Sequence, residues 1–261
     1  MLNNLLVLLA VIFYSLLVVL LFKNTNHEHY RIKKWWFISL IGCALLIHGG
    51  LLYHWIDVEQ GQNLTYLNVM SQVFWIMVAL QAILSLFKEV SNLGLILYPL
   101  AILSIISAWL MPGQHIIDTT EQPKQLLHLL LALLVVSIYA IACIQAILLA
   151  VQNYFLKHYR LKQTIVSFPS LETMELFLFQ MLQFGFFVFT LVVITGFAFF
   201  AMNGLKAVWG HSLIALFAWF VFGVLVFGRT HFGWRGLRAV YWTFAGFIVL
   251  LLSYFALLLF N

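Results

Sequence analysis

Charged side chains are scarce in this chain. Asp, Glu, Lys and Arg make up only 8% of its 261 residues, against about 25% in soluble globular proteins, and hydrophobic residues make up 64%. Such a composition excludes an ordinary water-soluble domain. Apolar runs long enough to cross a bilayer, which takes about 20 residues, recur along the whole sequence without a long soluble insert. The sequence therefore predicts a single integral membrane domain over residues 1–261.

Cysteine is also rare. The two cysteines, Cys43 and Cys143, both fall inside predicted membrane spans. They lack the C-x-x-C spacing of redox and zinc sites. We expect both side chains to be buried and to serve packing alone.

Polar clusters divide the sequence into eight apolar runs of helical length. We expect transmembrane helices near residues 2–22, 35–54, 67–87, 94–111, 125–152, 176–201, 209–228 and 238–260. Tryptophans near the ends of these runs suit the aromatic belts at membrane interfaces. The sequence thus predicts an all-α fold, a polytopic transmembrane helical bundle of about eight spans.

Lys and Arg are distributed unevenly over the connections between these spans. Eleven of the 13 lie in the first, third, fifth and seventh connections, and only Lys124 and Lys206 lie in the even-numbered ones. Positively charged loops stay in the cytoplasm, so we expect both termini to face outward. The net charge of +5 follows from this topology, and no alternation of basic and aromatic residues marks a nucleic-acid-binding face. The expected partner is the lipid bilayer, and no nucleic acid is expected.

The segment SFPSLETMELFLFQ leads into the sixth span. Pro169 ends the preceding segment, Ser170 can cap the next helix, and Glu172 falls in its positively polarised first turn. A helix from Ser170 to Phe200 would measure roughly 45 Å, more than the ~30 Å hydrocarbon core. We therefore expect this helix to tilt or to project into the cytoplasm, with Glu172 and Glu175 serving capping and solvation.

Four histidines fall within spans and, in the expected orientation, lie toward the outer membrane surface: His48, His54, His128 and His211. Ionisable groups inside a membrane are costly and usually face a bundle interior, a cavity or a partner. His54 is next to Trp55 and is expected at the interface. The other three are candidate axial ligands of haem iron or proton-titrating groups of a transport path. The alternative for each is a histidine hydrogen-bonded to a neighbouring helix.

Signatures of catalysis are missing from the sequence. It has no phosphate loop, no Ser-His-Asp set, no HExxH motif and no convincing pair of carboxylates. We therefore expect no enzyme activity, and no metal site beyond a possible haem iron.

Several segments carry a resemblance to a known family. They are WIDVEQGQNLTYLNVMSQVFW, LLHLLLALLVVSIYA, PSLETMELFLFQMLQFGF and AWFVFGVLVFGRTHFGWRGLRAVYWTFAGF, of which the pattern ending in GWRG is the most specific. The chain resembles the cytochrome c assembly family, the CcsA-like membrane proteins that handle haem, and within it the smaller YpjD and HemX-like branch of bacterial inner membrane proteins. The resemblance implies a multi-pass protein of the inner (cytoplasmic) membrane. It also implies that His128 is an outward-side axial ligand.

The chain departs from the haem-handling members of this family at two places. Their tryptophan-rich outward loop before the seventh span is reduced here to LKAVWGHSLIALFAW, which retains Trp209 and Gly210. The histidine that precedes the Arg of their last motif is replaced here by Phe227 in VFGR. Full haem export and attachment are therefore not implied by the resemblance.

Three functional hypotheses remain open at this point. The first is a protein that binds b-type haem on the outer side and takes part in cytochrome c biogenesis or haem handling, with His128 as one ligand and His48 or His211 as the other. The second is a cofactor-free regulatory or interaction protein, which binds a membrane protein partner or a component of haem synthesis through its loops. A small transporter is the third and least supported, because the spans contain no Asp, Glu, Lys or Arg near a midplane and no evident inverted repeat.

Overall fold

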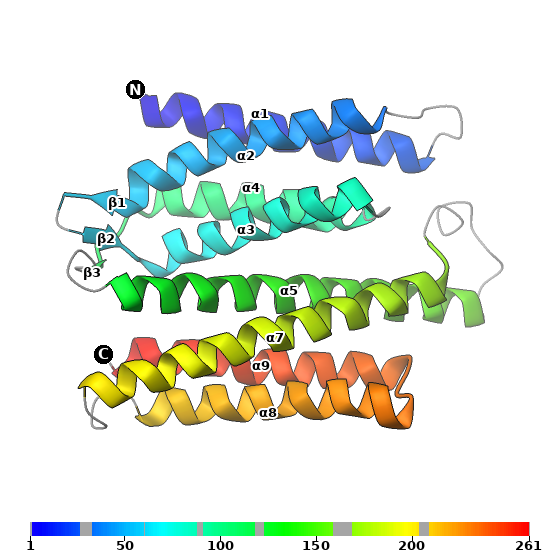
Figure 1. Ribbon diagram of the computed structural model, residues 1–261. Helices are drawn as coiled ribbons and strands as arrows, with labels where there is room; N and C mark the ends of the chain where they lie inside the picture. Colours follow the sequence, from blue (N-terminus) through cyan, green and yellow to red (C-terminus); the bar gives the residue numbers. More distant parts are fainter. Residues whose placement is uncertain are drawn as a thin grey trace. The chain divides into compact units, whose positions relative to one another are not determined.

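The computed structural model describes residues 2–26, 33–59, 61–87, 91–117, 123–158, 169–203 and 209–260. Nearly all of these residues are helical, which confirms the all-α bundle (Figure 1). The chain divides into two compact units, Met1–Glu121 with Lys162–Phe168, and Gln122–Leu161 with Pro169–Asn261. The two units are described separately below, and the single membrane domain over residues 1–261 stays a prediction.

The first unit is built from four long helices. They are α1 (Leu2–Asn26), α2 (Lys34–Ile56), α3 (Tyr66–Phe87) and α4 (Gly94–Leu110), the last preceded by the short 3₁₀ helix η1 (Ser91–Leu93). Helix α1 packs against α2 and α4, and α3 packs against the same two helices. The rings of Tyr14 and Tyr98 are fully buried at the centre of this group.

Three short strands form a small antiparallel sheet in the first unit. Strand β1 (Asp57–Val58) pairs with β2 (Gly61–Asn63), which pairs with β3 (Ile116–Ile117), as Figure 1 shows. The Asn63 side chain reinforces the sheet: its Nδ2 donates to the carbonyl of Gly113, and its Oδ1 accepts from the backbone N–H of His115. Pairing in this sheet provides hydrogen-bond partners for backbone groups of the loops next to the spans. The sequence analysis did not predict the sheet.

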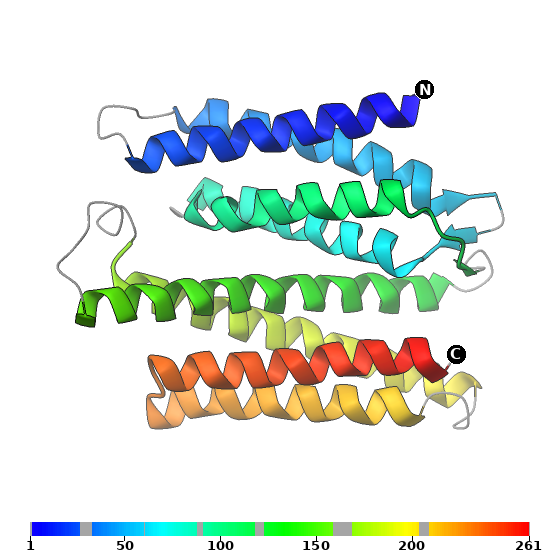
Figure 2. The same cartoon turned by 180° about the vertical axis from the view of Figure 1, so that it is seen from behind.

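The second unit also has four long helices. They are α5 (Pro123–His158), α7 (Leu171–Asn203), α8 (Trp209–Phe232) and α9 (Leu237–Phe260), seen from both sides in Figures 1 and 2. Helix α5 packs against α7 and α9, and α8 packs against α7 and α9. At the centre, the rings of Tyr139 and Phe222 stack with their centroids 3.6 Å apart.

The eight predicted spans all coincide with helices. Seven of the helices in the described residues are long and apolar enough to cross a membrane, whereas α4, with 17 residues and an internal Pro99, is shorter. The outward orientation of the termini stays a prediction.

The start of α7 is confirmed, because the backbone N–H of Thr173 donates to Ser170 Oγ and Glu172 lies in the first turn. Its 33 residues measure about 50 Å, so α7 exceeds the hydrocarbon core.

The prediction for the two cysteines is half wrong. Cys143 is buried, but Cys43 is exposed. The buried face of α2 runs through Ile41, Ala44 and His48, which follow the helical repeat. Cys43 falls between those positions and points away from the core of its unit.

Glycine brings α5 and α7 close together. A Cβ atom placed on Gly185 would lie 3.0 Å from Ile138 Cγ2 and 3.0 Å from Tyr139 Cε1. Both of those side chains are fully buried and have no room to move aside. Small residues at such helix contacts permit close backbone approach in membranes.

We predict that Gly185→Ala lowers the free energy of unfolding by about 1–3 kcal/mol through overpacking. Gly42→Ala is the matched control, because a Cβ there would meet nothing within 4 Å, and it should be neutral or stabilising by up to about 1 kcal/mol through helix propensity. Unfolding of the detergent-solubilised protein, followed by circular dichroism, measures both. Equal stability of the two variants would contradict the close packing of α5 and α7.

Candidate functional site

His128 lies near the start of α5 and faces α7. Its Nδ1 is 2.9 Å from Thr195 Oγ1. A Cβ atom on the next residue, Gly196, would lie 3.3 Å from His128 Cε1. The glycine therefore leaves room for the imidazole to lie against the backbone of α7, where it is half-buried.

The contacts of Thr195 favour one tautomer of His128. The Thr195 hydroxyl donates its only proton to the backbone carbonyls of Leu191 and Val192, at 2.9 and 3.0 Å. With that proton on either carbonyl, the Thr195 oxygen accepts from His128; we infer that Nδ1 then carries the ring proton and Nε2 keeps its lone pair. Among the described residues, Nε2 has no hydrogen-bond partner. A metal-ligating histidine is usually arranged in this way, with one nitrogen donating to the protein and the other free.

His48 has a different environment. It is fully buried in the first unit, and both of its ring nitrogens are hydrogen-bonded. Tyr14 Oη on α1 is 3.2 Å from Nδ1, and Ser71 Oγ on α3 is 2.9 Å from Nε2. His48 thus links three helices in the way expected of a packing histidine, and ligation of a metal would require it to give up one of these bonds.

The polar network around His48 continues through the first unit. The Tyr14 ring stacks on Tyr98 with centroids 6.0 Å apart, and Tyr98 Oη donates to Gln81 Oε1 at 2.9 Å. In the second unit, Gln145 Nε2 donates to the carbonyl of Met174 at 3.1 Å. These contacts support interhelical hydrogen bonding, not a transport path, as the role of these two glutamines.

The three candidate ligands are divided between the two units. His48 belongs to the first, whereas His128 and His211 belong to the second. His211 lies in the first turn of α8, and its side chain is outside the described part of the structure. His54 is exposed, as expected for an interfacial residue. Within the described residues no group of three or more His, Cys, Asp or Glu side chains could hold a metal ion.

Sequence reasoning missed an ion pair between α7 and α8. Arg229 Nη1 lies 3.1 Å from Glu175 Oε1 and also donates to the carbonyl of Trp234 at 3.2 Å. The Arg229 guanidinium sits 4.5 Å from the centre of the Phe179 ring. The sequence did contain a signal for this ion pair, because Arg229 and Glu175 were both expected at the ends of spans on the same side of the membrane. Charge reversal at Arg229 would therefore disturb the fold itself.

Comparison with known proteins decides the family. The sequence profile described as Cytochrome C assembly protein matches residues 38–261. The chain belongs to the cytochrome c assembly family. Inner membrane protein YpjD of Escherichia coli K12 is 31% identical over 254 residues, which cover 95% of this chain and 94% of that protein. The YpjD proteins of strains O6:H1 and O157:H7 match equally well.

No solved structure matches the chain. This member of the cytochrome c assembly family is a multi-pass membrane protein, because seven helices in the described part of the chain are able to span a membrane. Its similarity to YpjD assigns it to the inner membrane.

The hydrogen bonds of His48 lead to a stability prediction. His48→Ala should lower the free energy of unfolding by about 2–5 kcal/mol, because it leaves a cavity and removes a partner from Tyr14 and Ser71. His54→Ala removes the same side chain from an exposed position and should change stability by less than about 0.5 kcal/mol. Thermal unfolding of both variants in detergent gives the comparison. A His48 variant as stable as the His54 variant would show that the buried network does not hold the first unit together.

Proposed function

We propose that this chain is a haem-binding, non-enzymatic membrane protein that handles haem for cytochrome c biogenesis, with His128 Nε2 as one axial ligand of the iron. The observation that carries the proposal is the contact of His128 Nδ1 with Thr195 Oγ1, which holds the ring and leaves Nε2 without a hydrogen-bond partner among the described residues. Membership of the cytochrome c assembly family supplies the chemical context.

The second ligand in this proposal is His211 or His48. His211 shares the second unit with His128. His48 would first have to release Tyr14 or Ser71, and leaving a buried polar group without a partner costs about 1–3 kcal/mol. This difference in cost favours His211.

Haem held in this way would be attached by coordination of its iron, without a covalent bond to the protein. The chain has no C-x-x-C-H motif for covalent attachment, so the cofactor would be of b type. Bound haem would supply an iron centre able to change its oxidation state. The part played by this chain is to hold the His128 ring through Thr195 and to leave room beside Gly196.

The test is the reduced-minus-oxidised absorption spectrum of protein purified in mild detergent after expression with ample haem. We expect a six-coordinate haem spectrum from the wild type, loss of that spectrum in His128→Ala, and partial recovery when imidazole is added. His54→Ala, which removes an exposed histidine, is the control and should keep the spectrum.

A well-folded wild type without haem would overturn the proposal. That result would favour the cofactor-free alternative, in which the same fold binds a membrane protein partner or a component of haem synthesis. An unchanged spectrum in His128→Ala would overturn the assignment of the ligand.

Thr195 provides a second, quantitative prediction. Thr195→Val removes the acceptor for His128 Nδ1–H, and loss of such supporting hydrogen bonds typically weakens metal binding about 10–100-fold. Thr195→Ser keeps the hydroxyl and should bind haem within about threefold of the wild type. Haem titration followed at the Soret band measures both affinities. Equal affinity of the valine and serine variants would contradict the role given to Thr195.

A further inference from the structure

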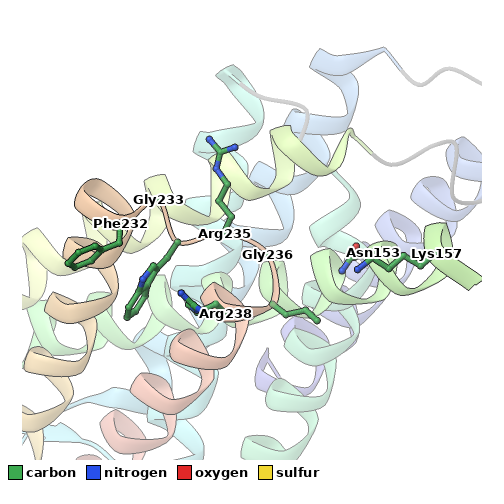
Figure 3. A pocket seen from close by; sticks show the side chains of 9 residues that line it. Asn153, Lys157, Phe232, Gly233, Arg235, Gly236 and Arg238 are labelled. Atoms are coloured by element: carbon green, nitrogen blue, oxygen red, sulfur yellow. The ribbon is translucent and has the colours of Figure 1, made fainter.

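A pocket of about 510 Å³ opens at one end of the second unit, where the turn between α8 and α9 meets the end of α5. Its lining is Asn153, Lys157, Phe232, Gly233, Trp234, Arg235, Gly236, Leu237 and Arg238. Figure 3 shows the α5 side chains on one side of the pocket and the turn on the other. A volume of this size suits a small-molecule group larger than a single ion.

The charge of this pocket is positive and largely unneutralised. Lys157, Arg235 and Arg238 line it, and none of the described lining residues is a carboxylate. Glu175 is paired with Arg229 at 3.1 Å, whereas its distance to Arg235 Nε is 3.9 Å. Within the described residues Lys157 and Arg238 make no ion pair. Cations held this close without a counter-charge favour an anionic ligand.

The backbone of the turn adds to the positive potential. Gly233 and Gly236 have φ values of 62° and 58°, a left-handed conformation that glycine adopts without strain. Helix α9 begins directly after this turn, at Leu237. The backbone N–H groups at the start of a helix lack intrahelical partners, and this end of the helix dipole is positive. The guanidinium of Arg238 lies 5.6 Å from the centre of the Trp234 ring, which restrains it at the pocket.

The pocket lies at the ends of three segments that are long and apolar enough to span a membrane. Three segments able to span the membrane end or begin at its lining: one ends at Lys157, one ends at Phe232 and one begins at Leu237. The apolar side chains of Phe232 and Leu237 are exposed beside the cations. An amphiphilic ligand would meet apolar surface and positive charge at this one place.

We propose that this pocket binds the phosphate group of an anionic phospholipid headgroup. Arginine presents N–H donors in a geometry that matches phosphate oxygens, and Lys157 adds a third cation from another helix. Basic pockets between transmembrane helices are a recognised mode of lipid headgroup binding. In the predicted topology the pocket faces the cytoplasmic leaflet.

The experiment is native mass spectrometry of the delipidated full-length protein titrated with phosphatidylglycerol, with phosphatidylcholine of the same acyl chains, and with soluble glycerol 1-phosphate. The test variant is the double substitution Lys157→Gln, Arg238→Gln. Its control, Lys23→Gln, Lys33→Gln, removes the same charge from exposed positions of the first unit.

We expect phosphatidylglycerol to bind the wild type more tightly than phosphatidylcholine does. Loss of two surface cations should raise its Kd roughly 30-fold in the test variant, and by less than about twofold in the control. Circular dichroism should show both variants folded.

Three results would overturn the proposal. Equal binding of the two lipids would remove the role of headgroup charge. Equal weakening in the test and control variants would assign binding to overall charge instead of the pocket. Glycerol phosphate binding as tightly as the lipid would identify the ligand as a soluble phosphate compound.

Discussion

The rest of this structure depends on one constraint: a polar group inside a bilayer must find its partner within the protein. The backbone meets this requirement as long helices. Side chains meet it by bonding across helices, as Tyr98 does with Gln81 and as Gln145 does with the carbonyl of Met174. In such a protein, an intramembrane nitrogen without a partner is a position where a ligand would be stabilised.

His48 and His128 illustrate this difference. His48 uses both ring nitrogens to connect three helices, so its contribution is to the stability of the first unit. Among the described residues His128 uses only Nδ1, which contacts Thr195, and we infer that Nδ1 is the protonated nitrogen because the Thr195 hydroxyl can donate within its own helix. The availability of His128 Nε2 for a ligand therefore depends on a threonine on another helix. The contact with Thr195 is possible because Gly196 has no side chain and the His128 ring can lie close to the α7 backbone.

Much of the fold could be predicted from the sequence, because hydropathy gives the helices directly and Ser170 gives the start of α7. The sheet could not, since strands of two or three residues contain no readable period. The exposure of Cys43 was missed because hydropathy does not show which face of α2 packs. The sequence identified His128 as the first candidate ligand and His48 as one of two choices for the second, but it did not show the hydrogen-bond partners of either ring. Their partners come from other helices, and Thr195 is 67 positions from His128.

The central claim is that His128 presents an unprotonated Nε2 while Nδ1 donates to Thr195. The most direct measurement is the ¹⁵N NMR spectrum of histidine-labelled protein in detergent, with the His128 signals assigned by their absence in His128→Ala. We predict the Nδ1-protonated tautomer for His128, and its loss in Thr195→Val. A His128 ring protonated at Nε2 in the wild type would contradict the account, because no lone pair would then be available for iron at that position.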